Sequence, residues 1–178
     1  MIYISQIKIA NELEDDIIEF FNSNLLKTYV WDETRVFPQD KTGVGVGGDM
    51  HNLPPMYHKL VQVVKQIKAH VSHDKRFETL QNVEIVKYPA GAQKGWHYDT
   101  ARTTTTGASI TYINDDYIGG HTIIDGVDVQ PVAGRTVYFD GLEFRHAVSH
   151  IVKRDRYTIS CWYGQDDDML CSREFLAL

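Results

Sequence analysis

The stretch Arg156-Tyr-Thr-Ile-Ser-Cys-Trp-Tyr163 decides the fold class of this chain. Its β-branched and aromatic residues predict a β-strand, in which alternate side chains point to opposite faces. One face is apolar and should pack against helices: Tyr157, Ile159, Cys161 and Tyr163. The other face is polar and mostly small: Arg156, Thr158, Ser160 and Trp162. A closed β-structure that turns arginine, threonine and serine inward lines a pocket.

The rest of the chain supports a mainly β fold with flanking helices. From about residue 83 onward, short runs rich in Val, Ile, Thr and Tyr alternate with Gly, Asn, Asp and Pro, which predicts strands and turns. These runs are Val83–Tyr88, Ser109–Asn114, His121–Ile124, Arg135–Phe139, Ala147–Val152 and Tyr157–Tyr163. Residues 11–27 and 55–73 instead repeat apolar residues every three or four positions, which predicts helices. We expect the helices to pack on one side of a closed or sandwiched β-structure.

The composition excludes several functional classes. A formal net charge of −6 offers no basic stripe for a nucleic-acid backbone. No apolar run approaches the ~20 residues of a membrane span, and the N-terminus does not resemble a signal peptide. Two cysteines, Cys161 and Cys171, make no disulfide framework. We therefore expect a cytoplasmic protein that binds neither nucleic acid nor membrane; the oligomeric state is left open.

The segment His97-Tyr-Asp99 offers two metal-binding side chains. In a strand, residues two apart share a face, so both can hold one ion. A histidine from a distant strand would complete the set, and both His146 and His150 are candidates. Two histidines and one carboxylate occupy one face of an octahedral ion and suit non-haem Fe(II). Taken alone, each of these residues is equally compatible with a core or turn position.

An inward Arg156 would need an anion, because a buried unpaired charge is costly. A ligand carboxylate would satisfy the guanidinium through a bidentate contact. The phenols of Tyr88 and Tyr112 are candidate donors to the same carboxylate. The alternative is that Arg156 is a surface residue of the turn Lys153-Arg-Asp-Arg156.

The glycine-rich segment Gly43-Val-Gly-Val-Gly-Gly48 formally matches a dinucleotide-binding fingerprint. No apolar strand precedes it and no helix opens after it, so nucleotide binding is disfavoured. Residues 38–48 are better explained as a long loop, either a lid over the site or a plain solvent loop.

The segment from Tyr88 to Gly164 resembles the catalytic core of the 2-oxoglutarate- and Fe(II)-dependent oxygenases, and within them the prolyl 4-hydroxylase branch. The resemblance is carried, in order, by Tyr88-Pro-Ala-Gly91, His97-Tyr-Asp99, Tyr112-Ile-Asn114, Gly119-Gly-His-Thr122, Pro131-Val-Ala-Gly134, His146-Ala-Val148 and Arg156-Tyr-Thr-Ile-Ser-Cys-Trp162. The family usually has glutamate after the two glycines, where this chain has His121. That departure leaves the iron set untouched and bears on substrate contacts.

The resemblance implies a double-stranded β-helix, a cupin-like jelly roll with N-terminal helices on one side. It implies a single dioxygenase domain over residues 1–178, with helical support and a flexible loop in 1–80 and the catalytic β-helix in 81–165. Iron would lie at His97, Asp99 and His146, and Arg156 would bind the distal carboxylate of 2-oxoglutarate. Either Tyr88 or Tyr112 would assist Arg156.

The implied activity is hydroxylation of peptidyl proline, with O2 consumed, succinate and carbon dioxide produced, and L-ascorbate as auxiliary reductant. A proline-containing polypeptide would bind between the 38–48 loop and the threonine-rich segment Thr100–Thr106, with Trp162 and Thr158 shaping the pocket. The small size and the lack of a secretory signal favour a microbial or viral cytosolic enzyme over a collagen hydroxylase of the endoplasmic reticulum. The alternatives are a lysyl or free small-molecule substrate, a zinc hydrolase, or a non-catalytic jelly-roll binding module.

Overall fold

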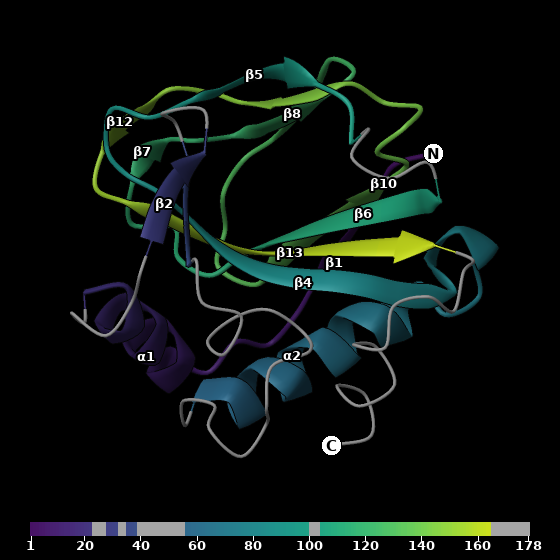
Figure 1. The fold of residues 1–178 in the computed structure, drawn as a ribbon, viewed down its shortest axis with the longest axis horizontal. Coiled ribbons are helices and arrows are strands. Elements are labelled where there is room, and N and C mark those ends of the chain that lie inside the picture. Colours follow the sequence, from purple (N-terminus) through teal and green to yellow (C-terminus); the bar gives the residue numbers. More distant parts are fainter. Residues whose placement is uncertain (23–27, 32–34, 39–55, 100–103, 165–178) are drawn as a thin grey trace.

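The computed structural model describes residues 1–22, 28–31, 35–38, 56–99 and 104–164. Within them, the strands form two facing sheets and a short pair of strands, all antiparallel (Figure 1). The larger sheet runs in the order β1 (Tyr3–Gln6), β10 (Arg135–Phe139), β6 (Thr105–Tyr112), β13 (Arg156–Gly164), β4 (Thr79–Tyr88), β3 (Arg35–Pro38) and β2 (Thr28–Trp31). The smaller sheet runs β5 (Lys94–His97), β11 (His146–Val148), β8 (Thr122–Ile124) and β9 (Val127–Val129). The arrangement is a jelly roll, as the sequence predicts.

The helices α1 (Asn11–Asn22) and α2 (Met56–His70) lie on the outer side of the larger sheet (Figure 1). A single buried cluster joins them to the apolar face of β13: Leu13, Ile17, Leu60, Val64, Ile67, Tyr157, Ile159, Cys161 and Tyr163. Each fully buried aliphatic side chain of this kind stabilises the fold by about 1.5–3 kcal/mol. The predicted assignment of the two faces of β13 is therefore confirmed. Along the described ranges, neither helix is long and apolar enough to cross a membrane.

Strand β13 lies in the middle of the larger sheet, and its polar side chains lie on the inner face of that sheet. It pairs with β4 on one side and β6 on the other. In this register Arg156 lies opposite Tyr88, and Thr158 lies opposite both Val86 and Tyr112. Because directly paired residues point to the same face, these side chains converge on the space between the two sheets.

The predicted strand over Ala147–Val152 is divided in the structure. Strand β11 ends at Val148, and β12 (Ile151–Lys153) pairs with β7 (Ile118–Gly119) outside both large sheets. A Cβ at Gly119 would lie 1.9 Å from the carbonyl oxygen of His150, and the φ of Gly119 is +85°. Only glycine permits this approach at that φ, so the chain can leave one sheet and join another within two residues.

Helix α2 also ends earlier than the predicted residue 73. Helix α2 stops at His70, where the amide of Val71 turns to the carbonyl oxygen of Lys68 in a tighter turn. Helix α1 covers Asn11–Asn22, and the remaining predicted residues, 23–27, lie outside the described part of the chain. The predicted loop over 38–48 lies outside it too, apart from Pro38 at the end of β3. The division of the chain into domains stays a prediction.

Candidate functional site

A pocket that opens to solvent lies between the two sheets, and the empty space in and at the mouth of it is about 440 Å³. Both sheets contribute to its lining, with five residues from β13, two from β4 and others from β5, β6, β10 and β11. The residues of greatest chemical interest are Tyr88, His97, Asp99, His146, Arg156, Thr158, Ser160 and Trp162. The inner face of β13 thus lines a pocket, as its alternation predicts.

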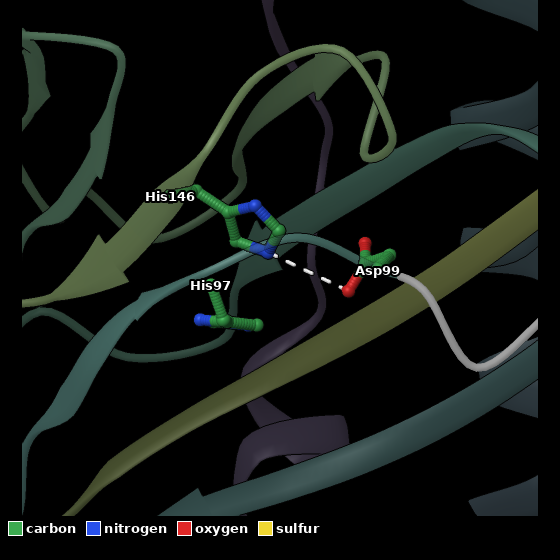
Figure 2. Close-up of side chains that lie close together, drawn as sticks. All are labelled: His97, Asp99 and His146. Carbon is green, nitrogen blue, oxygen red and sulfur yellow. Dashed lines mark ion pairs between the residues drawn. The ribbon is translucent and has the colours of Figure 1, made fainter.

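At one end of the pocket, His97, Asp99 and His146 point toward one another (Figure 2). One ligand atom from each residue lies within 4.8 Å of the others. Nε2 of His146 is 3.6 Å from Oδ1 of Asp99. His146 pairs directly with His97 across β11 and β5, and their ring centroids are 4.1 Å apart. The exposed His150 is not part of this group, so His146 is the histidine that the fold brings to His97 and Asp99.

The backbone around both histidines fixes their tautomers. Nδ1 of His97 lies 2.9 Å from the carbonyl oxygen of Gly95, and Nδ1 of His146 lies 3.2 Å from that of Phe144. A carbonyl oxygen can only accept a hydrogen bond, so each Nδ1 carries the hydrogen. The lone pair is then on Nε2, and a metal-binding histidine is commonly held by such a contact on its other nitrogen.

The electrostatics of the group also suit a cation. Burial and the neighbouring His146 lower the pKa of His97 to about 4, so its imidazole is neutral at physiological pH. Burial acts to raise the pKa of Asp99, but its contacts with His146, His97 and Trp162 outweigh burial and lower that pKa. Two imidazoles and one carboxylate are a donor set that fits a divalent iron ion.

Arg156 lies deeper in the pocket and is only 1% exposed. Within the described residues it forms no ion pair, and its Nη2 donates a single hydrogen bond, 3.1 Å long, to Oγ1 of Thr122. Its Nε has no hydrogen-bond partner there, and neither has the buried Oγ1 of Thr158. A buried cation with unused donors is costly unless an anion joins it. The pocket therefore fits a ligand that ends in a carboxylate.

The tyrosines named by the sequence flank Arg156 through their rings. The guanidinium carbon is 5.1 Å from the ring centroid of Tyr88 and 5.2 Å from that of Tyr112. The Tyr112 hydroxyl lies 2.7 Å from Oγ1 of Thr122 and 2.8 Å from the carbonyl oxygen of Val129. Tyr112 is not among the residues that line the pocket, whereas Tyr88 is. Of the two phenols, the geometry therefore favours Tyr88 for contact with a ligand and assigns Tyr112 to the support of Thr122.

Sequence reasoning did not single out Thr122 or Tyr117. Thr122 accepts the hydrogen bond from Arg156, and the only available signal was its place in the Gly119-Gly-His-Thr122 motif. Tyr117 is buried beside the same arginine, and burial raises the pKa of its phenol. No periodicity marks Tyr117, because it lies in the irregular connection between β6 and β7.

The remaining residues named by the sequence are Trp162 and the threonine-rich segment Thr100–Thr106. Trp162 lines the pocket and helps to lower the pKa of Asp99. Residues 100–103 of the threonine-rich segment are not described. Thr105 is buried in β6 and donates to Gln81 at 2.8 Å, so it is part of the sheet.

Comparison with known protein families agrees with this geometry. Residues 83–164 match the family model of the 2OG-Fe(II) oxygenase superfamily, where 2OG denotes 2-oxoglutarate. This segment belongs to the 2OG-Fe(II) oxygenase superfamily. The matched range contains the His97, Asp99 and His146 group and Arg156, and the family implies Fe(II), 2-oxoglutarate and O2 as its cofactor and cosubstrates.

Solved structures with this fold include prolyl hydroxylases. A prolyl-4-hydroxylase from Pseudomonas putida is 19% identical, with a TM-score of 0.66 over 93% of this chain and 92% of that chain. A Trichoplax adhaerens prolyl hydroxylase, in complex with a peptide fragment of the hypoxia inducible factor oxygen degradation domain, is 14% identical, with a TM-score of 0.69 over 99% and 86%. A Burkholderia pseudomallei 2OG-Fe(II) oxygenase family oxidoreductase is 16% identical, with a TM-score of 0.64 over 89% and 80%. No curated protein sequence matches the chain.

Proposed function

We propose that the protein is a 2-oxoglutarate- and Fe(II)-dependent dioxygenase that hydroxylates proline in a polypeptide. The observation that carries the proposal is the presence, in one pocket, of a two-histidine, one-carboxylate group and a buried arginine with unused donors. A metal site alone would be compatible with many reactions. A second, anion-requiring group at the deep end of the same pocket suits a dicarboxylate that reaches from the metal to the arginine.

In this proposal Nε2 of His97, Nε2 of His146 and the Asp99 carboxylate hold the iron. The carbonyl oxygens of Gly95 and Phe144 keep both imidazoles in the tautomer that exposes Nε2. When bound, Fe(II) with 2-oxoglutarate and O2 supplies the oxidant that inserts one oxygen atom into a C–H bond, with succinate and carbon dioxide as products.

Arg156 binds the distal carboxylate of 2-oxoglutarate. The hydrogen bond from its Nη2 to Thr122 and the flanking rings of Tyr88 and Tyr112 fix the plane of the guanidinium. An arginine held in this way loses little conformational freedom when it forms two parallel hydrogen bonds to a carboxylate. Thr158, whose hydroxyl has no hydrogen-bond partner in the described part of the chain, is placed to add a third contact.

The proline substrate is supported by the prolyl hydroxylases among the structures of the same fold, one of which holds a peptide fragment. Trp162 stands at the metal end of the pocket and offers an apolar surface to a pyrrolidine ring. Proline-rich segments are already extended, so they lose little entropy on entering a groove.

The test is to incubate the purified chain with Fe(II), 2-oxoglutarate, L-ascorbate and a panel of proline-containing peptides, and to follow succinate and peptide mass. Gain of one oxygen atom on proline, coupled to succinate, is the expected result. The His97→Ala variant supplies the inactive control. Peptides with lysine in place of proline, and free proline and lysine, complete the panel.

Three outcomes would contradict parts of this proposal. Hydroxylation of lysine or of a free amino acid alone would retain the reaction and reject the prolyl substrate. Hydrolysis supported by Zn²⁺ without 2-oxoglutarate would indicate a zinc hydrolase, in which Arg156 has no evident role. Absence of metal and 2-oxoglutarate binding together would leave a non-catalytic jelly-roll binding module.

A further inference from the structure

We propose that Trp96 and Arg145 form a clasp on the outer face of the smaller sheet that sets the geometry of the metal site on its inner face. This inference rests on the metal-binding role proposed above for His97 and His146. Trp96 precedes His97 on β5, and Arg145 immediately precedes His146 at the start of β11. Neighbouring strand residues point to opposite faces, so the two residues lie directly behind the two histidines.

The register between β5 and β11 needs such a device. Strand β5 has four residues and lies at one end of the smaller sheet, where its partner among the described strands is β11. His146 lies opposite His97, but Val148 lies opposite Lys94, so the register shifts between these pairs. A slip of one residue would turn His97 from the pocket to the outer face. A short edge strand next to an irregularity has few backbone contacts that oppose such a slip.

The clasp supplies a contact that exists in one register only. The guanidinium carbon of Arg145 lies 4.8 Å from the ring centroid of Trp96, within the range of a cation–π interaction. Trp96 is 49% exposed and belongs to none of the buried clusters in the described chain. Its large ring therefore contributes little to the core, and its contact with Arg145 is the role that its position supports.

Neither side chain touches the metal site, so both are positioning residues. With the clasp absent, the fold should persist, because the core clusters do not include either residue. His97 and His146 should then spend less time in the facing arrangement, and a metal ion should bind more weakly. Cation–π contacts at exposed sites correspond to a factor of roughly two to five in an equilibrium constant, which is about 0.5–1 kcal/mol.

The experiment titrates the full-length, metal-free chain with Co(II), whose visible absorption reports its coordination geometry. Trp96→Ala, Arg145→Ala and the double variant are compared with wild type, and Val127→Ala, an exposed apolar residue of the same sheet, is the control. Each single variant should weaken Co(II) binding about two- to fivefold. The double variant should bind Co(II) as tightly as the single variant with the lower affinity. Each single variant already lacks the Trp96–Arg145 contact, so the second substitution removes nothing further.

Conservative substitutions separate a role in positioning the metal ligands from a general effect on stability. Arg145→Lys and Trp96→Phe keep a cation and a ring, and should restore most of the affinity. The clasp would be overturned if both alanine variants kept the wild-type Co(II) affinity, even with a lower melting temperature of the metal-free chain. It would also be overturned if the losses of Co(II) affinity in the two single variants added fully in the double variant. Should Trp96→Ala fail to fold, the Arg145 pair of variants gives the same decision. Failure of the wild type to bind Co(II), or equal binding by His146→Ala, would instead overturn the proposed metal site.

Discussion

The carboxylate of Asp99 lies against the backbone of Gly141. A Cβ added at Gly141 would be 2.5 Å from Oδ2 of Asp99 and 2.9 Å from its Cβ. The amide of Asp99 donates a 2.9 Å hydrogen bond to the carbonyl oxygen of Gly141. Gly141 is not among the glycines with positive φ, so its role is to leave space. The carbonyl oxygen of Gly141 therefore positions the backbone of Asp99. The absence of a side chain at Gly141 leaves room for the Asp99 carboxylate.

Replacing Gly141 by alanine should weaken metal binding about 10- to 100-fold, the usual cost of disturbing a group that orients a metal ligand. The added methyl cannot coexist with the present position of the carboxylate, and Asp99 can move more easily than the backbone. The fold should survive, because alanine tolerates the backbone conformation of Gly141. Co(II) titration and far-ultraviolet circular dichroism measure the two effects.

Gly95→Ala is the matched control for that variant. Gly95 lies on β5 two residues before His97, and a Cβ at this position would meet nothing within 4 Å. Its carbonyl oxygen, which contacts His97, is retained in alanine. Equal losses of Co(II) affinity in both glycine variants would show that Gly141 has no special relation to Asp99.

The two histidines that the sequence left open can be separated directly. His146→Ala should abolish metal binding, because it removes one of the three ligand atoms that lie within 4.8 Å of one another. His150→Ala should leave binding within about twofold of wild type, since His150 is exposed and outside that group. Isothermal titration with Co(II) measures both. The reverse pattern would mean that the proposed ligand set is wrong.

Alternation along one strand was sufficient to predict much of this molecule. The two faces of β13 were assigned from residues 156–163 alone, and the structure places one in the helix-facing core and the other in the pocket. Period-two patterns carry this information because the side-chain direction of a strand is fixed by the pleat. The family resemblance favoured His146 over His150. The geometry agrees, because His146 occupies the position that pairs with His97 across β11 and β5.

Features set by tertiary packing could not be predicted in this way. Gly141 and Thr122 act through residues distant in sequence, and neither has a local pattern that reveals its neighbour. The division between β11 and β12 depends on the approach of Gly119 to His150, which no window of the sequence contains. The sequence named Tyr112 because its phenol could donate to a ligand carboxylate. In the structure its hydroxyl contacts Thr122 and Val129, and these contacts depend on how β8 and β9 fold over Tyr112.

Asp74 should make a pH-dependent contribution to the free energy of unfolding. Its carboxylate accepts hydrogen bonds from the side chain and amide of Arg76 and from the hydroxyl of Tyr3. The hydrogen bond from the Arg76 side chain is the main cause that lowers the pKa of Asp74 to about 2. Since the folded-state pKa is depressed, this stabilisation is present above pH 3.8 and is lost as the pH falls toward about 2.

Asp74→Asn should therefore cost up to about 1 kcal/mol at pH 7, because asparagine keeps the cap acceptor but loses the charge that pairs with Arg76, and progressively less below pH 4. Urea unfolding at pH 7, 4 and 2.5 measures the difference between variant and wild type. Asp16→Asn, which removes the more exposed Asp16–Lys59 pair, should cost no more than about 1 kcal/mol at pH 7. A difference between Asp74→Asn and wild type that stays constant down to pH 2.5 would exclude the carboxylate as its source.

Arg156 provides the sharpest test of the cosubstrate site. Arg156→Met keeps most of the side-chain volume but removes the charge, so 2-oxoglutarate should bind about 10- to 100-fold more weakly, as expected for a lost charge-assisted hydrogen bond. The metal-free, ligand-free variant should be as stable as wild type or more so, because the buried guanidinium forms no ion pair within the described residues. Thermal unfolding with Co(II), with and without 2-oxoglutarate, measures both, since a ligand raises the melting temperature according to its affinity. Arg154→Ala, an exposed arginine two residues away that pairs with Asp116, is the control and should retain wild-type binding. An equal rise in melting temperature with 2-oxoglutarate in wild type and Arg156→Met would remove Arg156 from the site.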